Sequence, residues 1–271
     1  MAKGVKRSRL DAELVRRGLA RSREHASELI AAGKVKVSGT VAGKPATGVG
    51  ADAPIVVDTS EHEDPGYASR GAYKLLGALE VFDRIEVAGR RVLDAGASTG
   101  GFTDVLLRND AAHVIAVDVG YGQLVWALQT DERVTVMDRT NVRTLTLEDI
   151  GGDPVDLVVS DLSFISLTLV LPALIGVVKP DGDLVLMVKP QFEVGKERLG
   201  KGGVVRDPEL RADAVRAVAA KAHELGWGIE GVAASPLPGP SGNVEYFLWI
   251  RRVAPGLDET MLQTAIESGP Q

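Results

Sequence analysis

Apolar residues along most of this chain come in short continuous runs that alternate with segments long enough to form helices. Such runs are typical of parallel strands, which are buried on both faces because helices cover both sides of the sheet. From residue 67 onward, the runs predict strands at 91–95, 113–118, 133–138, 155–161, 184–189, 229–233 and 244–250. Helices are expected at 103–109, 124–129 and 210–225. The pattern predicts an α/β fold with a Rossmann-like, doubly wound and mostly parallel sheet of seven strands.

The first sixty residues follow a different pattern, in which two short amphipathic helices precede small strands. Ser8 is suited to cap a first helix that ends at Gly18, and a second helix runs from Ser22 to Gly33. Short strands are then expected at 34–37, 40–41 and 55–57. We therefore predict a small α+β domain at 1–59, a linker at 60–68, a large domain at 69–253 and a polar tail at 254–271.

The composition is that of an ordinary globular protein, with 45% hydrophobic and 25% charged residues. It contains no cysteine, which excludes disulfides, thiolate metal sites and a catalytic cysteine. Its 4 histidines lack the spacing of metal ligands, so no metal site is expected. The first residues lack the apolar core of a secretory signal, and no apolar stretch is long enough to span a bilayer. We therefore expect a soluble, cytoplasmic protein.

The net charge of −6 conceals an uneven distribution. Residues 1–60 contain 11 Lys and Arg against 6 Asp and Glu, whereas the remainder contains 20 against 31. A basic segment joined to an acidic body favours a polyanion-binding module, although a solvated helix surface would give the same counts. Because residues 1–60 hold no aromatic side chain, contacts to the backbone of folded RNA fit better than stacking on unpaired bases. The candidate RNA-binding residues here are Arg9, Arg16, Arg17, Arg21, Arg23, Lys34 and Lys36.

Polar residues stand at the carboxyl ends of five predicted strands, where a doubly wound sheet binds its ligand. They are Asp94, Asp118, Asp138, Asp161 and Lys189. The Gly-rich turn after the first strand has Ser98 where a dinucleotide fingerprint needs glycine, and no Walker lysine follows. This pattern favours S-adenosylmethionine, with Asp118 placed to bind ribose hydroxyls and Asp138 to reach the adenine; a nicotinamide cofactor is the weaker alternative. The candidate cofactor-binding residues are Asp94, Gly96, Ser98, Thr99, Gly100, Gly101, Phe102, Asp118 and Asp138.

Two lysines and two acids can meet beside the methyl group of such a cofactor: Lys74, Asp161, Lys189 and Glu245. A ribose 2′-hydroxyl is a weak acid and needs a base in the transition state. A lysine can act as that base when desolvation or a nearby cation makes its neutral form accessible. We assign this role to Lys189, with the other three residues positioning it and the ribose. A structural ion-pair network at the sheet edge is the alternative interpretation.

Several segments resemble known families. Residues 9–39, with the order of helix, turn, helix, Gly-Lys-Val and alternating strand, resemble the RNA-binding domain named after ribosomal protein S-four. The segments S-R-G-A-Y-K-L, D-A-G-A-S-T-G-G-F-T, D-L-S-F-I-S-L, V-K-P-Q-F-E and S-G-N-V-E-Y-F-L-W resemble those that carry the Lys-Asp-Lys-Glu set of FtsJ/RrmJ-type ribose 2′-O-methyltransferases. Together they are similar to the TlyA family, which joins these two domains in one chain.

The resemblance implies a class I methyltransferase fold and S-adenosylmethionine-dependent 2′-O-methylation of cytidine in ribosomal RNA, in the 30S subunit, the 50S subunit or both. It also implies a link to susceptibility to capreomycin and viomycin. The family carries the name haemolysin as well, but no segment here supports a pore. A non-catalytic RNA-binding assembly factor is a further alternative, which the intact set of four charged residues disfavours. Beside the catalytic residues, the path of the RNA is expected to follow Arg70, Arg139, Lys196, Lys201 and Arg206.

Overall fold

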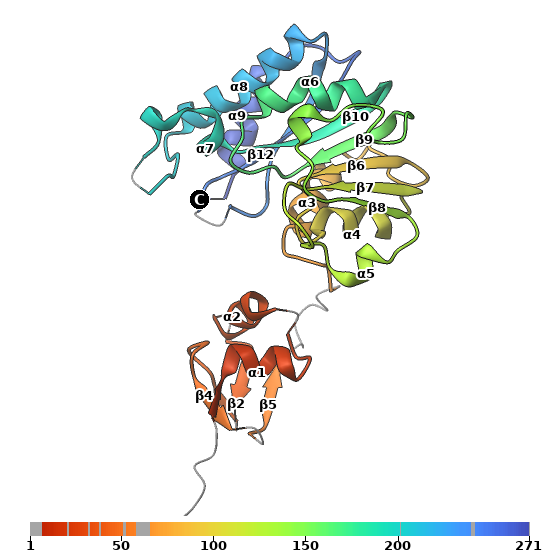
Figure 1. The fold of residues 1–271 in the computed structure, drawn as a ribbon. Helices are drawn as coiled ribbons and strands as arrows, with labels where there is room; N and C mark the ends of the chain where they lie inside the picture. Colours follow the sequence, from red (N-terminus) through yellow and green to blue (C-terminus); the bar gives the residue numbers. More distant parts are fainter. Residues whose placement is uncertain are drawn as a thin grey trace, which may run out of the picture. The chain divides into compact units, whose positions relative to one another are not determined.

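The computed structural model describes residues 7–20, 22–31, 33–37, 39–50, 53–57, 66–200, 202–239 and 242–270, with the side chains of Arg7 and Lys196 excepted. The chain divides into two compact units, residues 1–66 and residues 67–271 (Figure 1). The division falls within the segment expected to be a linker, most of which lies outside the described residues. Each unit has its own hydrophobic core.

The first unit packs two helices against short strands. Its elements are β1 (Arg7–Arg9), α1 (Leu10–Arg16), α2 (Arg23–Ala31), β2 (Val35–Val37), β3 (Thr40–Val41), β4 (Gly48–Gly50) and β5 (Ile55–Val57). β2 pairs with β3 and β5 in an antiparallel sheet, and β1 pairs with β4. Leu10, Leu14, Ala26, Ile30 and Val35 are buried together, in agreement with the predicted amphipathic helices.

The start of the first helix differs from the prediction. Ser8 does not cap it, because Ser8 belongs to β1 and pairs with the distant β4. The helix begins at Leu10, and Arg9 occupies the N-cap position without a side-chain hydrogen bond to the helix amides. A serine ahead of an amphipathic run is a local signal for a cap, and here a long-range strand pairing overrides it.

The second unit is built on a seven-stranded sheet with the order β11-β12-β10-β9-β6-β7-β8. The strands are β6 (Arg91–Ala95), β7 (His113–Val117), β8 (Val134–Met137), β9 (Val155–Ser160), β10 (Val178–Val188), β11 (Gly228–Ala234) and β12 (Tyr246–Arg251). The five strands from β10 to β8 run parallel, and β12 and β11 add antiparallel pairs at one edge. This confirms the predicted mostly parallel sheet. Because the chain proceeds from β6 in both directions, a crevice is expected at the carboxyl ends of β6 and β9.

Helices cover both faces of this sheet (Figure 1). The helices are α3 (Ala72–Val81), α4 (Gly101–Arg108), α5 (Trp126–Gln129), η1 (Val142–Thr144), α6 (Leu167–Val177), α7 (Pro190–Glu193), η2 (Lys196–Arg198), α8 (Pro208–Glu224) and α9 (Glu259–Ser268). α3, α4 and α5 share one apolar core with the sheet, and α6, α8 and α9 share the other. The result is the three-layer α/β architecture that the alternating apolar runs predicted.

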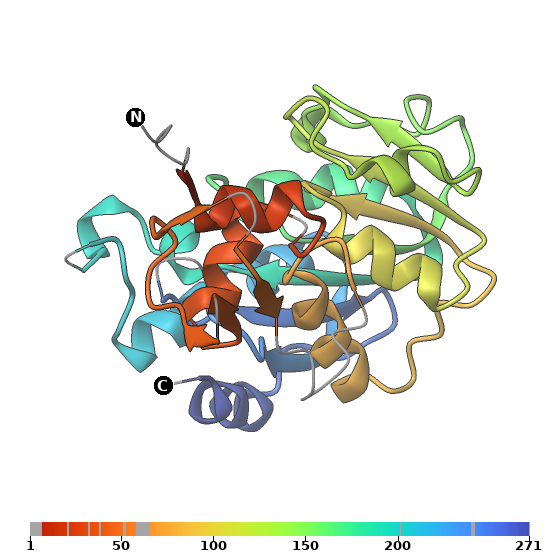
Figure 2. The ribbon, with the colours of Figure 1, turned by 90° about the horizontal axis from the view of Figure 1, so that it is seen from below.

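The segment expected to be a polar tail contains a packed helix. α9 contacts the edge strand β11, and Figure 2 shows it beside the strands at that edge of the sheet. Leu262, Ala265 and Ile266 are buried, and their spacing places them on one face of the helix. The Asp258 carboxylate caps the helix by accepting hydrogen bonds from the amides of Thr260 and Met261. Residues 254–270 therefore belong to the second unit.

None of the helices in the described ranges combines the length and the apolar character that crossing a bilayer requires. Over the same ranges, no group of three or more His, Asp or Glu side chains is arranged to hold a metal ion.

Candidate active site

Four charged side chains from distant parts of the sequence meet at the carboxyl end of the central strands. Lys74 lies on α3, Asp161 follows β9, Lys189 follows β10 and Glu245 precedes β12. Lys189 Nζ lies 2.5 Å from Asp161 Oδ1, and Lys74 Nζ lies 2.5 Å from Glu245 Oε2. Lys74 Nζ is also 3.9 Å from Asp161 Oδ2, so Asp161 links the two lysines. The structure thus brings together all four residues that the sequence suggested.

This cluster is buried but not sealed. Lys74 and Lys189 are each 6% exposed and Glu245 is fully buried, so each charge needs a partner to offset its lost hydration. Two cations and two anions satisfy that need. However, Lys74, Asp161 and Lys189 also line a cavity of about 210 Å³. A purely structural ion-pair network does not need to line a cavity. The position of these three charged side chains in a cavity wall therefore favours a catalytic role over a purely structural one.

A second cavity, of about 450 Å³, adjoins the first. The two share Gly96, Ser98, Asp161 and Ser163 in their walls. The larger one extends past the carboxyl end of β7 at Asp118. Together they form an elongated space that runs from the cluster along the ends of the parallel strands, as expected for a ligand of a doubly wound sheet.

The Gly-rich turn shapes the wall between these cavities. Gly96 has φ +90°, and a Cβ atom there would lie 2.9 Å from the backbone oxygen of Asp161, so only glycine fits. The amide of Ser98 donates a hydrogen bond to Asp118 Oδ2, while Asp118 Oδ1 accepts one from Gly120. The predicted cofactor-binding residues that line a cavity are Gly96, Ser98, Thr99, Gly101, Phe102 and Asp118.

Three predicted cofactor-binding residues, Asp94, Gly100 and Asp138, are not among the residues that line the two cavities. Asp94 is fully buried beneath the turn, where its Oδ2 accepts a hydrogen bond from the Thr103 hydroxyl at 2.7 Å. Burial raises the pKa of Asp94 to about 7, even though the bond from Thr103 acts in the opposite direction. Asp138 Oδ2 accepts a hydrogen bond from the amide of Gly122, and Gly100 packs against leucine side chains. For Asp94, full burial beneath the turn fits support of the turn, and contact of Asp138 and Gly100 with a cofactor stays a prediction.

Sequence reasoning missed several residues of the site. Asn141 lines the larger cavity, which Asp138 does not. Ser163 lines both cavities, and its hydroxyl accepts a hydrogen bond of 2.9 Å from Lys189 Nζ. Ser163 stands in the D-L-S-F segment that also contains Asp161, so this segment could have identified it as a site residue. Gly239 stands in the segment P-L-P-G-P-S-G-N-V-E-Y-F-L-W, which also resembles the TlyA family, but no role was expected for it; a Cβ atom there would lie only 2.5 Å from Glu245 Oε1.

The basic residues of the first unit are arranged in pairs around buried acids. Asp11 accepts hydrogen bonds from Arg9 and Arg23, and Glu13 accepts them from Arg16 and Arg17. The bonds from Arg9 hold the pKa of Asp11 well below its usual range, and those from Arg16 and Arg17 lower the pKa of Glu13 to about 2. The side chains of Arg9, Arg16 and Arg23 are still 51–63% exposed.

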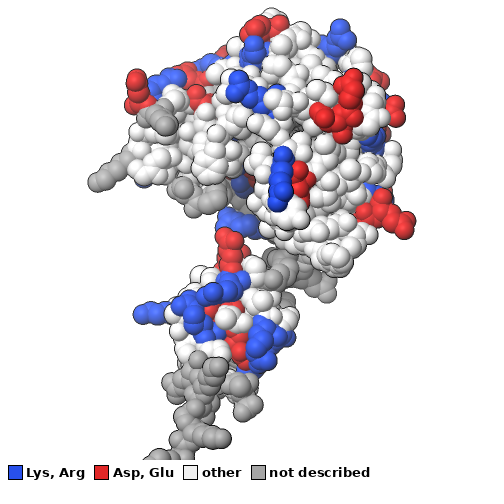
Figure 3. Space-filling view, viewed as in Figure 1, with Lys and Arg blue, Asp and Glu red and all other residues white. Residues whose placement is uncertain are grey.

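The guanidinium groups of these arginines are therefore held by the buried acids while much of each side chain stays exposed to solvent. Figure 3 shows one face of this unit, where Lys and Arg side chains gather around acidic ones. Lys36 is exposed and Lys34 is half-buried. In the second unit, Arg70, Arg139 and Arg206 are exposed, and the guanidinium of Arg139 lies 4.2 Å from the ring centre of Tyr121. Arg21, Lys201 and the side chain of Lys196 lie outside the described residues.

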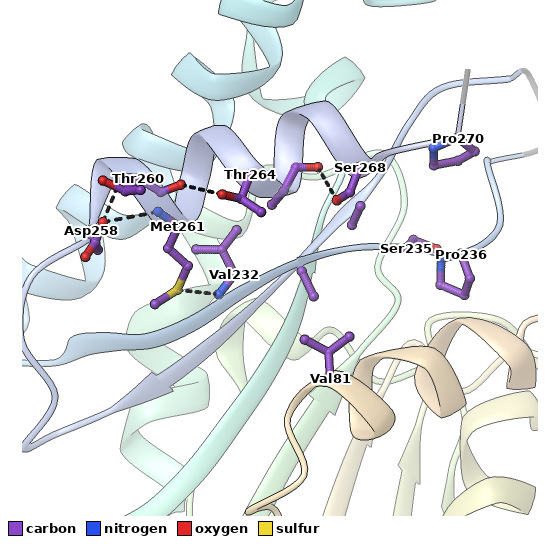
Figure 4. Close-up of a pocket in the computed structure, with 13 residues that line it drawn as sticks. Val81, Val232, Ser235, Pro236, Asp258, Thr260, Met261, Thr264, Ser268 and Pro270 are labelled. Atoms are coloured by element: carbon purple, nitrogen blue, oxygen red, sulfur yellow. Dashed lines mark hydrogen bonds between the residues drawn. The ribbon is translucent and has the colours of Figure 1, made fainter.

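A larger cavity, of about 780 Å³, lies elsewhere, between α9, the edge strand β11 and Val81 of α3 (Figure 4). Its walls are mostly apolar or hydroxyl-bearing. Among the lining residues that the structure describes, Asp258 is the one ionisable side chain, and its carboxylate caps α9. The described residues that line this cavity therefore offer no free group for acid–base chemistry, and the charged cluster is the candidate active site.

Comparisons with known proteins identify a family for each of the two units. Residues 67–252 match the family of FtsJ-like methyltransferases, which covers the whole sheet and the charged cluster, and residues 8–55 match the S4 domain. The 16S/23S rRNA (cytidine-2'-O)-methyltransferase TlyA of Mycobacterium tuberculosis is 61% identical, over 98% of this chain and 100% of its own length.

Two other similar proteins carry a different description. Hemolysin A of Brachyspira hyodysenteriae is 36% identical over 88% of this chain and 97% of its own. A solved structure of a candidate hemolysin from Streptococcus thermophilus is 35% identical, with a TM-score of 0.76, and the match covers 97% of this chain and 96% of that one. The two-domain architecture is thus shared by proteins that carry both kinds of name.

Proposed function

The chain belongs to the family of FtsJ-like methyltransferases, and from this premise we propose that it methylates the 2′-hydroxyl of a cytidine ribose in ribosomal RNA, with S-adenosylmethionine as the methyl donor. The observation that carries the proposal is the paired cluster of Lys74, Asp161, Lys189 and Glu245 at a cavity. The substrate is suggested by the M. tuberculosis relative, which is similar along the full length of the chain.

The residues around the two cavities fit this cofactor. Both oxygens of Asp118 already accept one backbone hydrogen bond, and each keeps acceptor capacity for a ribose hydroxyl. The turn 96–102 presents backbone amides and glycines where an amino-acid carboxylate can approach. Asn141 and Val142 line the larger cavity beyond Asp118, where an adenine would lie. When bound, the cofactor supplies an electrophilic methyl group on a sulfonium.

In the proposed reaction, Lys189 in its neutral form accepts the proton of the ribose 2′-hydroxyl while the ribose oxygen forms its bond to the methyl carbon. The methyl–sulfur bond breaks with its electron pair left on sulfur. Asp161 and Ser163 hold Lys189 Nζ from two sides and so direct its lone pair. Lys74 is held by Glu245, whose other oxygen accepts a hydrogen bond of 3.3 Å from Gln191. Positioning of this kind supplies a large part of the acceleration.

The experiment that tests the proposal is transfer of labelled methyl from S-adenosylmethionine to purified 30S and 50S subunits. We expect label in the RNA of at least one subunit, at a cytidine whose 3′-phosphodiester bond has become resistant to alkali because the 2′-oxygen is blocked. S-adenosylhomocysteine should inhibit the transfer. Label on a base would contradict the ribose chemistry. Cofactor binding without transfer to either subunit would favour a non-catalytic RNA-binding role.

A methyl group at Gly239 should disable the site without unfolding the protein. In Gly239→Ala the new Cβ would overlap Glu245 Oε1, so the carboxylate that holds Lys74 must shift. We expect the kcat for methyl transfer to fall by about tenfold or more, since small misplacements of reacting groups have effects of that size or larger. Gly256→Ala is the matched control, because nothing lies within 4 Å of a Cβ there. Equal rates for both variants would show that the position of Glu245 is unimportant.

The arginine pairs of the first unit predict a salt effect on RNA binding. Arg16 is 63% exposed and shares Glu13 with Arg17, so Arg16→Ala leaves Glu13 paired. We expect weaker binding and a slope of log affinity against log salt that is reduced by about 1, the effect of one lost phosphate contact. Arg216→Ala, which removes an ion-paired arginine of α8, should leave the slope unchanged. An unaltered slope for Arg16→Ala would remove Arg16 from the RNA-binding surface.

A further inference from the structure

The segments that follow β9 and β10 are linked to each other at three successive levels. β9 and β10 are neighbouring parallel strands, so their chains leave the sheet side by side. At the first level, Lys189 meets Asp161 and Ser163. At the second, the rings of Phe164 and Phe192 lie 5.2 Å apart between their centres. At the third, Glu193 reaches the start of α6.

The contact of Glu193 with the start of α6 consists of two hydrogen bonds. Glu193 Oε2 accepts a hydrogen bond of 2.6 Å from the Ser166 hydroxyl, and Oε1 accepts one of 2.8 Å from the amide of Leu167. Ser166 is the N-cap of α6, so the carboxylate also lies at the positive end of an 11-residue helix. Burial raises the pKa of Glu193, while these two bonds favour its ionised form.

We infer that Glu193 is a positioning residue for the methyl transfer, which holds the Asp161–Ser166 loop against the segment that carries Lys189. Its two partners are groups on the opposite loop, and neither belongs to the reacting cluster. Without Glu193, the two segments would keep the aromatic contact and the Lys189 contacts, but the far end of the loop would be released. Asp161 would then move relative to Lys189, which it must orient.

The competing explanation is that Glu193 only caps α6 and stabilises the fold. The two explanations predict different effects of removing Glu193 on stability and on kcat. Loss of a cap lowers the stability of the fold and leaves the chemistry of the remaining folded molecules intact. Loss of a positioning contact lowers kcat in molecules that are fully folded and bind their substrates normally. The inference rests on the proposed function for its kinetic readout, so a second readout independent of activity is needed.

The experiment compares Glu193→Ala and Glu193→Gln with Glu197→Ala, which removes an exposed glutamate from the neighbouring η2. The kcat, the KM for each substrate and the melting temperature are measured for all three. We expect Glu193→Ala to reduce kcat about tenfold or more with little change in KM, at temperatures where the protein is folded. Glu193→Gln should recover most of the rate, because its amide can still accept from Leu167 and donate to Ser166. Wild-type kcat in Glu193→Ala, or a loss as large in Glu197→Ala, would overturn the inference.

A double-mutant cycle and amide hydrogen exchange test the contact of Glu193 further. Ser166→Ala removes only one of the two bonds, so the double variant Ser166→Ala/Glu193→Ala should lose less kcat than the product of the single losses. A loss of kcat in the double variant equal to the product of the two single losses would contradict a contact between Ser166 and Glu193. Amide hydrogen exchange at 161–168 should also be faster in Glu193→Ala than in the wild type, whatever RNA the enzyme uses. If the wild type transfers no methyl group, the proposed function fails, while unchanged exchange would overturn the loop contact itself.

Discussion

Lys189→Ala is expected to lower the rate of methyl transfer by about 10²–10⁴-fold, the usual contribution of a general base. The fold should survive, because Asp161 keeps Lys74 at 3.9 Å as a partner for its charge. The variant Lys189→Arg tests whether the reaction needs residue 189 as a proton acceptor or only as a positive charge. Arginine keeps the charge and donors but remains protonated in proteins, so it cannot take the proton. We therefore expect both variants to be nearly inactive while still binding the cofactor.

The measurement is single-turnover methyl transfer with saturating RNA, together with cofactor affinity by calorimetry. Lys179→Ala is the matched control, because Lys179 lies near the start of the same strand and pairs with Asp156. It should retain wild-type rates. Substantial activity in Lys189→Arg would show that the charge of Lys189, rather than its capacity to accept a proton, is what the reaction needs.

Asp94→Asn is expected to stabilise the second unit, and more so as the pH rises. Burial raises the folded-state pKa of Asp94 to about 7 from 3.8, so the folded protein holds a proton that the unfolded chain releases. Its contribution to stability is present in full below pH 3.8 and is lost as the pH rises toward 7. Asparagine resembles the neutral acid at every pH. The advantage of Asp94→Asn should therefore grow by about 2–3 kcal/mol between pH 5 and pH 8, at about 1.4 kcal/mol per unit.

Denaturant unfolding at several pH values checks this prediction. The 3 tryptophans all lie beyond residue 66, so their fluorescence follows the second unit alone and avoids the mixed transition of two units. Asp83→Asn, at an exposed position, is the control. A gain in stability for Asp94→Asn that stays constant from pH 5 to pH 8 would contradict a buried, proton-holding carboxyl group.

Some features of this protein could be read from local sequence because local physics decides them. The strand Arg91–Ala95 begins and ends where the apolar run does, since burial on both faces requires such a run. The polar residues that follow the predicted strands could also be expected to lie close together, because parallel strands bring their carboxyl ends to one edge of the sheet. This is why Asp118, Asp161 and Lys189 were found at the cavities. Lys74 and Glu245 were added to these residues because the segments around them resemble those of FtsJ-type methyltransferases.

Other features depend on contacts between distant segments, which periodicity does not encode. Asp94, near the end of β6, and Asp138, directly after β8, resemble Asp118 in their place along the chain, yet neither lines a cavity: Asp94 accepts a hydrogen bond from Thr103 and Asp138 accepts one from the amide of Gly122. Ser8 has the chemistry of a helix cap, but pairing with β4 places it in a strand. Residues 254–270 look polar, because only one face of α9 carries the apolar residues that the sheet covers.

The sequence by itself determined the seven apolar strands of the large sheet, the glycine turn and the uneven charge, because each depends on neighbours along the chain. The candidate residues Lys74, Asp161, Lys189 and Glu245 came from motifs that resemble a known family. Only the tertiary structure decided how those charges are paired. It joined the arginines of the first unit two by two to Asp11 and Glu13, and placed Gly239 against Glu245 and Glu193 against α6. Charge pairing and close approach are set by distances across the fold, and a side chain acquires them only when the segments have packed.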